Sequence, residues 1–301
     1  MSNAYQTKRQ LKKEQNAFWY CRDLNERELL DLLDHRNSYI RVAAVEKLQI
    51  QANAELADRM IELCSATDYR LRSSGAAILA SLTFSSKEKL EQVINILSFF
   101  ALNDSSKEVR SSAIYALGYR RAMERKYHNF ILSILTRTAK DADASIRFAT
   151  THALGQLEDK KAIPVVEKLL RDPDKHVRDW TAFYIKNSDS GYDSEEIRNS
   201  LVAMLDDEYD DARAEAVCTL AYLRDKRALP ALRRELDVNE YSIKDVMAEA
   251  AADLGDASLL PNLEVWAERF PGDRHIETQL RRLQIKVGQA KRQRPASRKA
   301  T

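Results

Sequence analysis

The sequence contains few of the residues that form tight turns, with only 7 Gly and 6 Pro among its 301 residues. Folds built from many short strands need such residues at most of their turns, so this scarcity argues against a β-sandwich or a β-barrel. Hydrophobic residues make up 44% and charged residues 31% of the chain, as is typical of a folded globular protein. We therefore predict a fold made mostly of helices.

Long apolar runs and paired cysteines are also missing. No stretch approaches the roughly 18 consecutive apolar residues that cross a membrane, and the opening segment "MSNAYQTKRQLKKEQ" lacks the apolar core of a signal peptide. The 3 cysteines, Cys21, Cys64 and Cys218, are odd in number and far apart, which argues against a disulfide framework. These features predict a cytoplasmic protein with reduced thiols.

Charge is unevenly distributed along the chain. Of its 48 Lys and Arg residues, 8 lie between Arg281 and the C-terminus, where there are no acids, so residues 1–280 carry 40 bases against 46 acids, a net charge of −6. Residues 288–301, "GQAKRQRPASRKAT", show no apolar periodicity and are predicted to form a disordered basic tail. Such a tail could bind nucleic acid through its phosphates, whereas the acidic body is a poor match for a duplex-binding groove.

An acid and an arginine recur six residues apart in the middle of the chain. The copies begin "DSSKEVR", "DADASIR", "DPDKHVR" and "DEYDDAR", and related basic positions flank them at Arg41, Arg72 and Lys244. Successive basic positions are 31 to 38 residues apart, a period that indicates stacked structural repeats. We predict that the acids and arginines bridge within and between repeats as a ladder of charge-assisted hydrogen bonds. The ladder residues are Asp104 and Arg110, Asp141 and Arg147, Asp172 and Arg178, and Asp207 and Arg213.

Each repeat has the pattern of two helices joined by a short loop. Pro164, Pro230 and Pro261 stand where the first turn of a first helix is expected, and this position needs no helical hydrogen bond from them. Gly118 and Gly155 stand near the ends of second helices and are predicted to form left-handed caps. One hairpin cannot bury its apolar stripe alone, so neighbouring hairpins must stack. The predicted domains are a partly helical segment over residues 1–24, a solenoid over 25–287 and the tail over 288–301.

The combination of Asp, Val-Arg, small residues and Leu-Gly in these repeats resembles the HEAT-repeat family, in particular its bacterial short-repeat branch, the phycobilisome-lyase-like HEAT proteins. This resemblance implies an all-α fold, a right-handed α-solenoid superhelix of about eight HEAT helical hairpins. The segments "LNERELLDLLDHRNS", "VRDWTAFYI" and "RDKRALPALRREL" are further similar to enterobacterial HEAT-repeat proteins encoded beside Rhs elements. Those proteins are regarded as immunity proteins, so it is the resemblance that implies binding and neutralisation of the toxic C-terminal domain of a neighbouring Rhs polymorphic toxin.

The enzymes among HEAT-like proteins are poor matches. Deoxyhypusine hydroxylase binds two irons through His-Glu pairs, and none of the 5 histidines here is followed by Glu. Phycobilin lyases share the repeat, but Cys64 and Cys218 fall on apolar helical stretches, and Trp180 beside Asp179 resembles the cleft of alkylpurine DNA glycosylases only superficially. We therefore expect no catalytic residues, no metal, no cofactor and no enzymatic activity.

Second helices of stacked HEAT hairpins line the inner, concave surface, where a partner would bind. We number each second helix from its ladder Arg or Lys, the ladder base, as position zero. Positions −1, +3 and +7 then share a predicted buried face, and positions +1, +5 and +9 form a row that is predicted to point outward. Cys218 belongs to this outward row, and Trp180, at position +2, lies on its margin. These positions hold aromatics in the middle repeats, as binding hot spots do, and acids in the last one. The predicted partner-binding residues are Tyr115, Tyr119, Phe148, His152, Asp179, Trp180, Phe183, Asp210, Asp211, Tyr222, Asp245 and Glu249.

Residues 189–215 hold ten acids and two bases, and such a segment would steer a basic partner such as a nuclease toward this surface. Together these features predict a protein-binding scaffold with a protein partner, no membrane association and no requirement for nucleic acid. A general bacterial HEAT-repeat adaptor and a nucleic-acid-binding HEAT-like protein remain as alternatives to the immunity protein.

Overall fold

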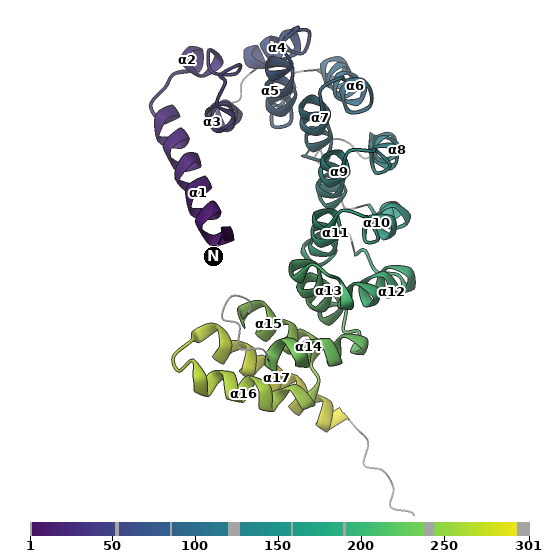
Figure 1. Cartoon of the computed structure of the whole chain (residues 1–301). Helices are drawn as coiled ribbons and strands as arrows, with labels where there is room; N and C mark the ends of the chain where they lie inside the picture. Colours follow the sequence, from purple (N-terminus) through teal and green to yellow (C-terminus); the bar gives the residue numbers. More distant parts are fainter. Residues whose placement is uncertain are drawn as a thin grey trace, which may run out of the picture. The chain divides into compact units, whose positions relative to one another are not determined.

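The computed structural model describes residues 2–51, 54–84, 86–119, 127–157, 159–188, 191–237 and 244–293. These residues form helices joined by short loops and contain no strand, which confirms the all-α prediction. Within them, helices α2 to α17 pair into eight hairpins, each made of a first and a second helix (Figure 1). The chain divides into two compact units, Met1–Ala162 and Ile163–Thr301, and each is described by itself.

The first unit is a two-layered stack of four hairpins preceded by one long helix (Figure 1). Second helices α3, α5, α7 and α9 pack on one another in chain order, and α1 packs on α3 in the place of a preceding second helix. The elements are α1 (Ser2–Cys21), α2 (Glu26–Leu30), α3 (Ser38–Ile50), α4 (Ala54–Leu63), α5 (Tyr69–Leu79), α6 (Lys87–Asn103), α7 (Lys107–Tyr119), α8 (His128–Thr138), α9 (Ala144–Leu157) and the 3-10 turn η3 (Lys160–Ala162).

The second unit repeats this plan with the row of second helices α11, α13, α15 and α17. Its elements are α10 (Ile163–Leu169), α11 (Lys175–Asn187), α12 (Glu195–Ala203), η4 (Met204–Asp206), α13 (Asp210–Tyr222), η5 (Lys226–Ala228), α14 (Leu229–Asp237), α15 (Lys244–Leu254), η6 (Ala257–Leu259), α16 (Leu260–Arg269) and α17 (Arg274–Gln293). Helix α17 passes Gly288, where the sequence predicts the tail to begin, because the next helix-disfavouring position is Arg294, before Pro295. Residues 294–301 of the predicted tail lie outside the described residues.

Short polar side chains fix where the helices begin. Asn25 and Glu28 form a reciprocal capping box at α2, and Asp68 and Asp174 accept backbone N–H groups at the starts of α5 and α11. Ser86 caps α6 in the same way. Each cap satisfies donors that the first helical turn leaves unpaired, so these polar residues place the loops between helices.

The predicted left-handed caps at Gly118 and Gly155 are wrong. Both glycines are buried inside helices α7 and α9, and the left-handed glycines among the described residues are Gly191, Gly255 and Gly272. A Cβ on Gly118 would lie 2.6 Å from Cα of Ala153 in α9. The absence of a side chain at Gly118 therefore lets two second helices approach closely, and the backbone of Gly118 stays helical.

The core follows the predicted face of the second helices. At positions −1, +3 and +7 from Arg213, the side chains of Ala212, Ala216 and Leu220 are fully buried. Cys218, expected to point outward at +5, is also buried, because α15 packs over it and its Sγ donates a weak hydrogen bond to the carbonyl of Val246 at 3.8 Å. Burial raises the pKa of Cys218 and of Cys64 to about 12, and all three cysteines are unpaired and covered.

Candidate protein-binding surfaces

The ladder arginines bind two partners in a geometry that the sequence pattern does not reveal. Arg178 donates from Nη1 to the backbone carbonyl of Asp172, six residues earlier, at 2.8 Å. Its Nε and Nη2 donate to the carboxylate of Asp207 in the next hairpin at 2.6 and 2.7 Å. This pairing lowers the pKa of Asp207. The bond within a hairpin thus uses a carbonyl, and the ion pair joins neighbouring hairpins.

The same arrangement recurs at other hairpin interfaces. Arg72 holds the carboxylate of Asp104 at 2.9 and 3.0 Å, and Arg110 lies 3.7 Å from that of Asp141. The within-hairpin bond to the backbone carbonyl six residues earlier recurs as well. Arg110 donates to the carbonyl of Asp104 at 3.2 Å, Arg147 to that of Asp141 at 2.9 Å and Arg213 to that of Asp207 at 2.7 Å. Each ladder acid accepts the N–H group two residues on, as Asp172 does from Asp174 at 2.9 Å.

The last interface contains a ladder acid that the sequence reasoning missed. Lys244 forms an ion pair with Asp273, whose Oδ1 accepts the N–H of His275. Asp273 stands six residues before Gln279, so the repeat continues in "DRHIETQ" with Gln in the place of the base. A search for acids at the repeat period, without the requirement for Arg, would have found it.

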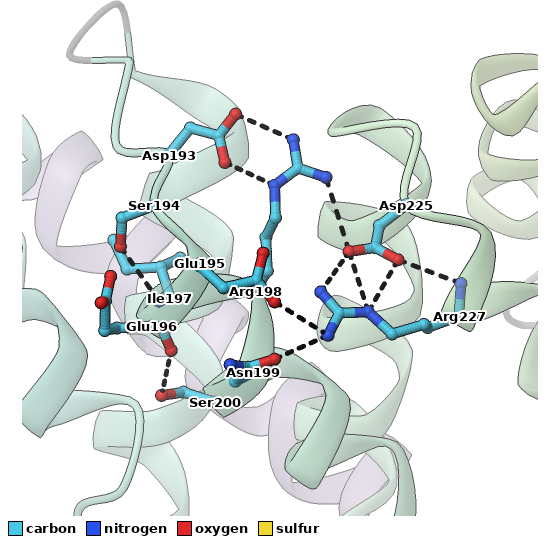
Figure 2. Close-up of polar contacts among 10 residues, drawn as sticks. All are labelled: Asp193, Ser194, Glu195, Glu196, Ile197, Arg198, Asn199, Ser200, Asp225 and Arg227. Carbon is cyan, nitrogen blue, oxygen red and sulfur yellow. Dashed lines mark hydrogen bonds and ion pairs between the residues drawn. The ribbon is translucent and has the colours of Figure 1, made fainter.

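A second ion-pair network ties the first helices of the second unit together (Figure 2). Arg198 binds Asp193 at 2.7 and 2.8 Å and Asp225 at 3.4 Å, while Arg227 binds Asp225 at 2.6 Å and Glu195 at 3.3 Å. The two arginines, Arg227 first, lower the pKa of Asp225 to about 2. Asp193 and Glu195 of the acidic segment 189–215 therefore form ion pairs with arginines, although both side chains remain exposed.

Four of the predicted binding residues lie together on α7 and α9 in the first unit. The ring centroid of His152 lies 4.9 Å from that of Tyr115 and 5.7 Å from that of Tyr119. Tyr119 is 59% exposed, whereas Tyr115, Phe148 and His152 are half-buried. Burial lowers the pKa of His152 and raises that of Tyr115, so in both residues it favours the neutral form.

The aromatic residues of the second unit gather on α11. The centroid of the Trp180 ring lies 5.3 Å from that of Phe183 and 5.9 Å from that of Tyr184. Trp180 is 39% exposed, and Tyr222 on the neighbouring α13 is 48% exposed. Tyr184 was not among the predicted residues, and its ring packs against those of Trp180 and Phe183.

Partly buried carboxylates lie on the same row of helices. Burial, reinforced by Asp211, raises the pKa of Asp179 on α11 to about 6. Burial and the neighbouring Asp179, Asp211 and Glu249 raise the pKa of Glu215 on α13 to about 7, although Lys186 opposes this. Lys186 lies 3.9 Å from Glu249 on α15. Glu215 was not among the predicted residues, but it stands at position +2 in its repeat, as Trp180 does.

The remaining predicted acids are more exposed and act at the edges of helices. Asp210 is paired with Arg213 at 2.5 Å, and Asp245 with Lys244 at 2.8 Å. Asp211 accepts a hydrogen bond from Tyr209 and thereby raises the pKa of that phenol. We call Asp179, Trp180, Phe183, Asp211, Glu215, Tyr222 and Glu249 the second-unit surface.

The side chains of the described residues form no group of three or more His, Cys, Asp or Glu that could hold a metal ion. Across the same part of the chain, no helix combines the length and the apolar character needed to span a bilayer.

A stack of helical hairpins with a repeated acid–base ladder defines an α-helical repeat protein. The family model for HEAT repeats matches residues 26–118 and 94–186, and the chain belongs to the HEAT-repeat family. Protein YibA of Escherichia coli (strain K12) is 37% identical over 283 residues, which cover 94% of this chain and 99% of YibA. The X-ray structure of E. coli YibA matches with a TM-score of 0.75 and 35% identity over 90% of this chain and 96% of that one.

One more distant structure shares the fold. Importin beta matches with a TM-score of 0.52 and 14% identity, covering 87% of this chain and 40% of that one. A chain from the complex of CpcE and CpcF of phycocyanin lyase from Nostoc sp. PCC7120 matches with a TM-score of 0.47 and 15% identity, over 77% of this chain and 94% of that one. None of these descriptions refers to a toxin, so the link to Rhs elements stays a prediction.

Proposed function

We propose that this HEAT-repeat protein is a non-catalytic scaffold that binds a basic protein through the second-unit surface. The observation that carries the proposal is the position of Asp179 and Glu215, whose partly buried carboxylates lie on the packed helices α11 and α13 that also carry the exposed rings of Trp180 and Tyr222. A partly buried carboxylate among other acids is destabilising when ionised, and at Glu215 the nearby Lys186 offsets this only in part. A Lys or Arg from a partner would neutralise it, while the aromatic rings supply the apolar contact area.

The more specific proposal is that the partner is the toxic C-terminal domain of an Rhs protein and that binding neutralises it. Support comes from the similarity of "LNERELLDLLDHRNS", "VRDWTAFYI" and "RDKRALPALRREL" to HEAT-repeat proteins encoded beside Rhs elements. A nuclease domain is basic because it binds nucleic acid, which suits an acidic surface. Neutralisation by covering an active site requires tight binding and no chemistry on this chain, and we expect it to take place in the cytoplasm.

The proposal is tested by co-expressing the chain with the Rhs C-terminal domain from the same genome and by measuring the affinity of the purified pair with calorimetry. We expect survival of the host cells and a nanomolar complex. An unrelated basic nuclease domain is the control and should neither bind tightly nor be neutralised. Absence of binding to the Rhs domain would remove the immunity proposal, whereas tight binding without protection would favour the general adaptor.

A further inference from the structure

In the described part of the chain, the first hairpin interface lacks the ion pair that the ladder bases Arg72 and Arg178 form with the next hairpin. Arg41 is the ladder base of α3, and its Nη1 donates to the backbone carbonyls of His35 and Arg36 at 2.7 and 3.3 Å. Arg72 and Arg178 make the same carbonyl contacts and use their Nε and Nη2 groups to hold a carboxylate of the next hairpin. Ala66, six residues before Arg72, stands where that carboxylate is expected for Arg41, and the same loop holds Asp68 two residues later.

Asp68 is held by a different arginine. Arg70 binds its carboxylate through Nε at 3.1 Å and Nη2 at 2.5 Å, and this bonding lowers the pKa of Asp68 to about 2. Arg70 stands two residues before the ladder base Arg72, and the corresponding residues of other hairpins cannot supply such a pair of donors; they are Glu108, Ser145, His176 and Asp211. Among the described residues no carboxylate lies within 4.0 Å of the Arg41 guanidinium, although its backbone contacts hold it in the ladder orientation.

A pocket opens at this point of the first unit. It has a volume of about 980 Å³, and its wall contains four arginines, Arg36, Arg41, Arg70 and Arg72, against the two acids Asp68 and Glu108. Positive charge is therefore in excess, and Ser105 and Ser106 add hydroxyl groups at the rim. Arg41 is half-buried, so its donors face a partly desolvated space in which an ion pair is stronger than in bulk water.

We infer that this pocket binds an Asp or Glu side chain of a partner protein, whose carboxylate takes the place at Arg41 that a neighbouring hairpin fills elsewhere. The choice of a carboxylate rests on the ladder itself, because Arg72 and Arg178 bind carboxylates through the same two N–H groups at 2.6 to 3.0 Å. The site lies in the first unit and takes an acidic group, so it is independent of the basic partner proposed for the second-unit surface.

The test uses the full chain and a fluorescein-labelled, amidated hexaglutamate peptide, with hexaglutamine as the control peptide, and measures fluorescence anisotropy at low salt. Hexaglutamate should bind and hexaglutamine should not. The substitution Arg41→Gln should weaken binding at least fivefold. Arg70→Ser should weaken it as much, because Asp68 is then free to pair with Arg41. Arg36→Ser removes the same charge from the same wall and should have a clearly smaller effect.

Equal losses in Arg36→Ser, Arg41→Gln and Arg70→Ser would show a plain charge effect and overturn the assignment, as would unchanged binding in Arg41→Gln. Acetate should compete with the peptide at least as well as inorganic phosphate; stronger competition by phosphate would point to a phosphate site instead. Circular dichroism and urea midpoints verify that each variant is folded. Should Arg41→Gln fail to fold, the comparison of Arg70→Ser with Arg36→Ser still tests the assignment of the site. Arg70 is not a ladder base, so its substitution leaves the ladder ion pairs between hairpins in place.

Discussion

Gly118 of α7 lies directly against Ala153 of α9, so close that a Cβ on the glycine would stand 2.6 Å from the Ala153 Cα. The atom in the way belongs to a helix backbone, which cannot move aside as the end of a side chain can. We expect Gly118→Ala to lower the free energy of unfolding by about 2 kcal/mol, measured by urea denaturation.

Gly288 is the matched control for this substitution, because a Cβ there meets nothing within 4 Å. Gly288→Ala in α17 should be neutral or stabilise the chain by up to about 1 kcal/mol, since alanine is the better helix former. A neutral Gly118→Ala variant would contradict the close helix packing.

The ladder predicts unequal losses at two aspartates of the same repeat position. Asp207 binds Arg178 at 2.6 Å with its side chain 7% exposed, whereas Asp141 lies 3.7 Å from Arg110 and is 27% exposed. Asp207→Ala should cost about 3 kcal/mol, because it leaves a half-buried arginine unpaired, and Asp141→Ala about 1 kcal/mol. Each of the two acids also accepts one backbone N–H group, so both substitutions lose this hydrogen bond and its cost cancels in the comparison. Equal shifts of the urea midpoint would contradict the assigned geometry.

Glu215 predicts a pH dependence of stability. Its pKa in the folded chain, about 7, lies above the ordinary value of 4.5, so between these pH values the folded chain holds a proton that the unfolded chain releases. The free energy of unfolding should therefore fall as the pH rises from 5 to 8. In Glu215→Gln this fall should be smaller by about 1 kcal/mol, a value reduced for partial solvent exposure. Parallel pH profiles of the two proteins would contradict the burial of this carboxylate.

The same carboxylate predicts proton release on binding. A basic partner that contacts Glu215 stabilises its ionised form and lowers its pKa, so near pH 7 the complex should release protons to the buffer. Calorimetry of complex formation with the Rhs domain, in two buffers of different ionisation enthalpy, measures the number of protons released. Glu215→Gln should reduce it, while Asp206→Asn, which changes an acid that is 88% exposed, should not. Proton uptake would exclude a cation at Glu215.

The aromatic and acidic residues of the second-unit surface should affect binding kinetics differently. Trp180→Ala or Phe183→Ala removes apolar contact and should cost about 2 kcal/mol or more, seen as faster dissociation and loss of protection. Asp211→Lys should mainly slow association and weaken its salt dependence. Surface plasmon resonance at two salt concentrations separates these effects. Unchanged dissociation in both aromatic variants would place the partner elsewhere.

The fold followed from the sequence because its period is visible in a few residues. Asp172 and Arg178 mark one repeat, and the apolar positions around them give the buried face of each second helix. The partners of Arg178 could not be predicted, because residues six apart in one hairpin and residues in adjacent hairpins are equally compatible with the spacing. Asp273 was missed because Gln279 lacks the charge that marks the repeat.

The candidate surface was predicted less completely for a related reason. Outward direction was assigned from helix period alone, which ignores what a neighbouring hairpin covers. Cys218 is covered by α15, and Glu215, one turn earlier, keeps its carboxylate near the row of acids. Tyr222, predicted in the outward row, and Trp180, predicted on its margin, are 48% and 39% exposed.

The two-partner geometry of the ladder also bears on how such a chain changes its length. Arg72 and Arg178 each bind a carbonyl of their own hairpin and a carboxylate of the next, so these interfaces join the same two kinds of residue, Arg72 with Asp104 and Arg178 with Asp207. Loss or duplication of one whole hairpin places a base opposite an acid again, whereas a break inside a hairpin does not. Gene recombination can therefore lengthen or shorten the array in steps of one repeat while the ion pairs at the new junction are preserved.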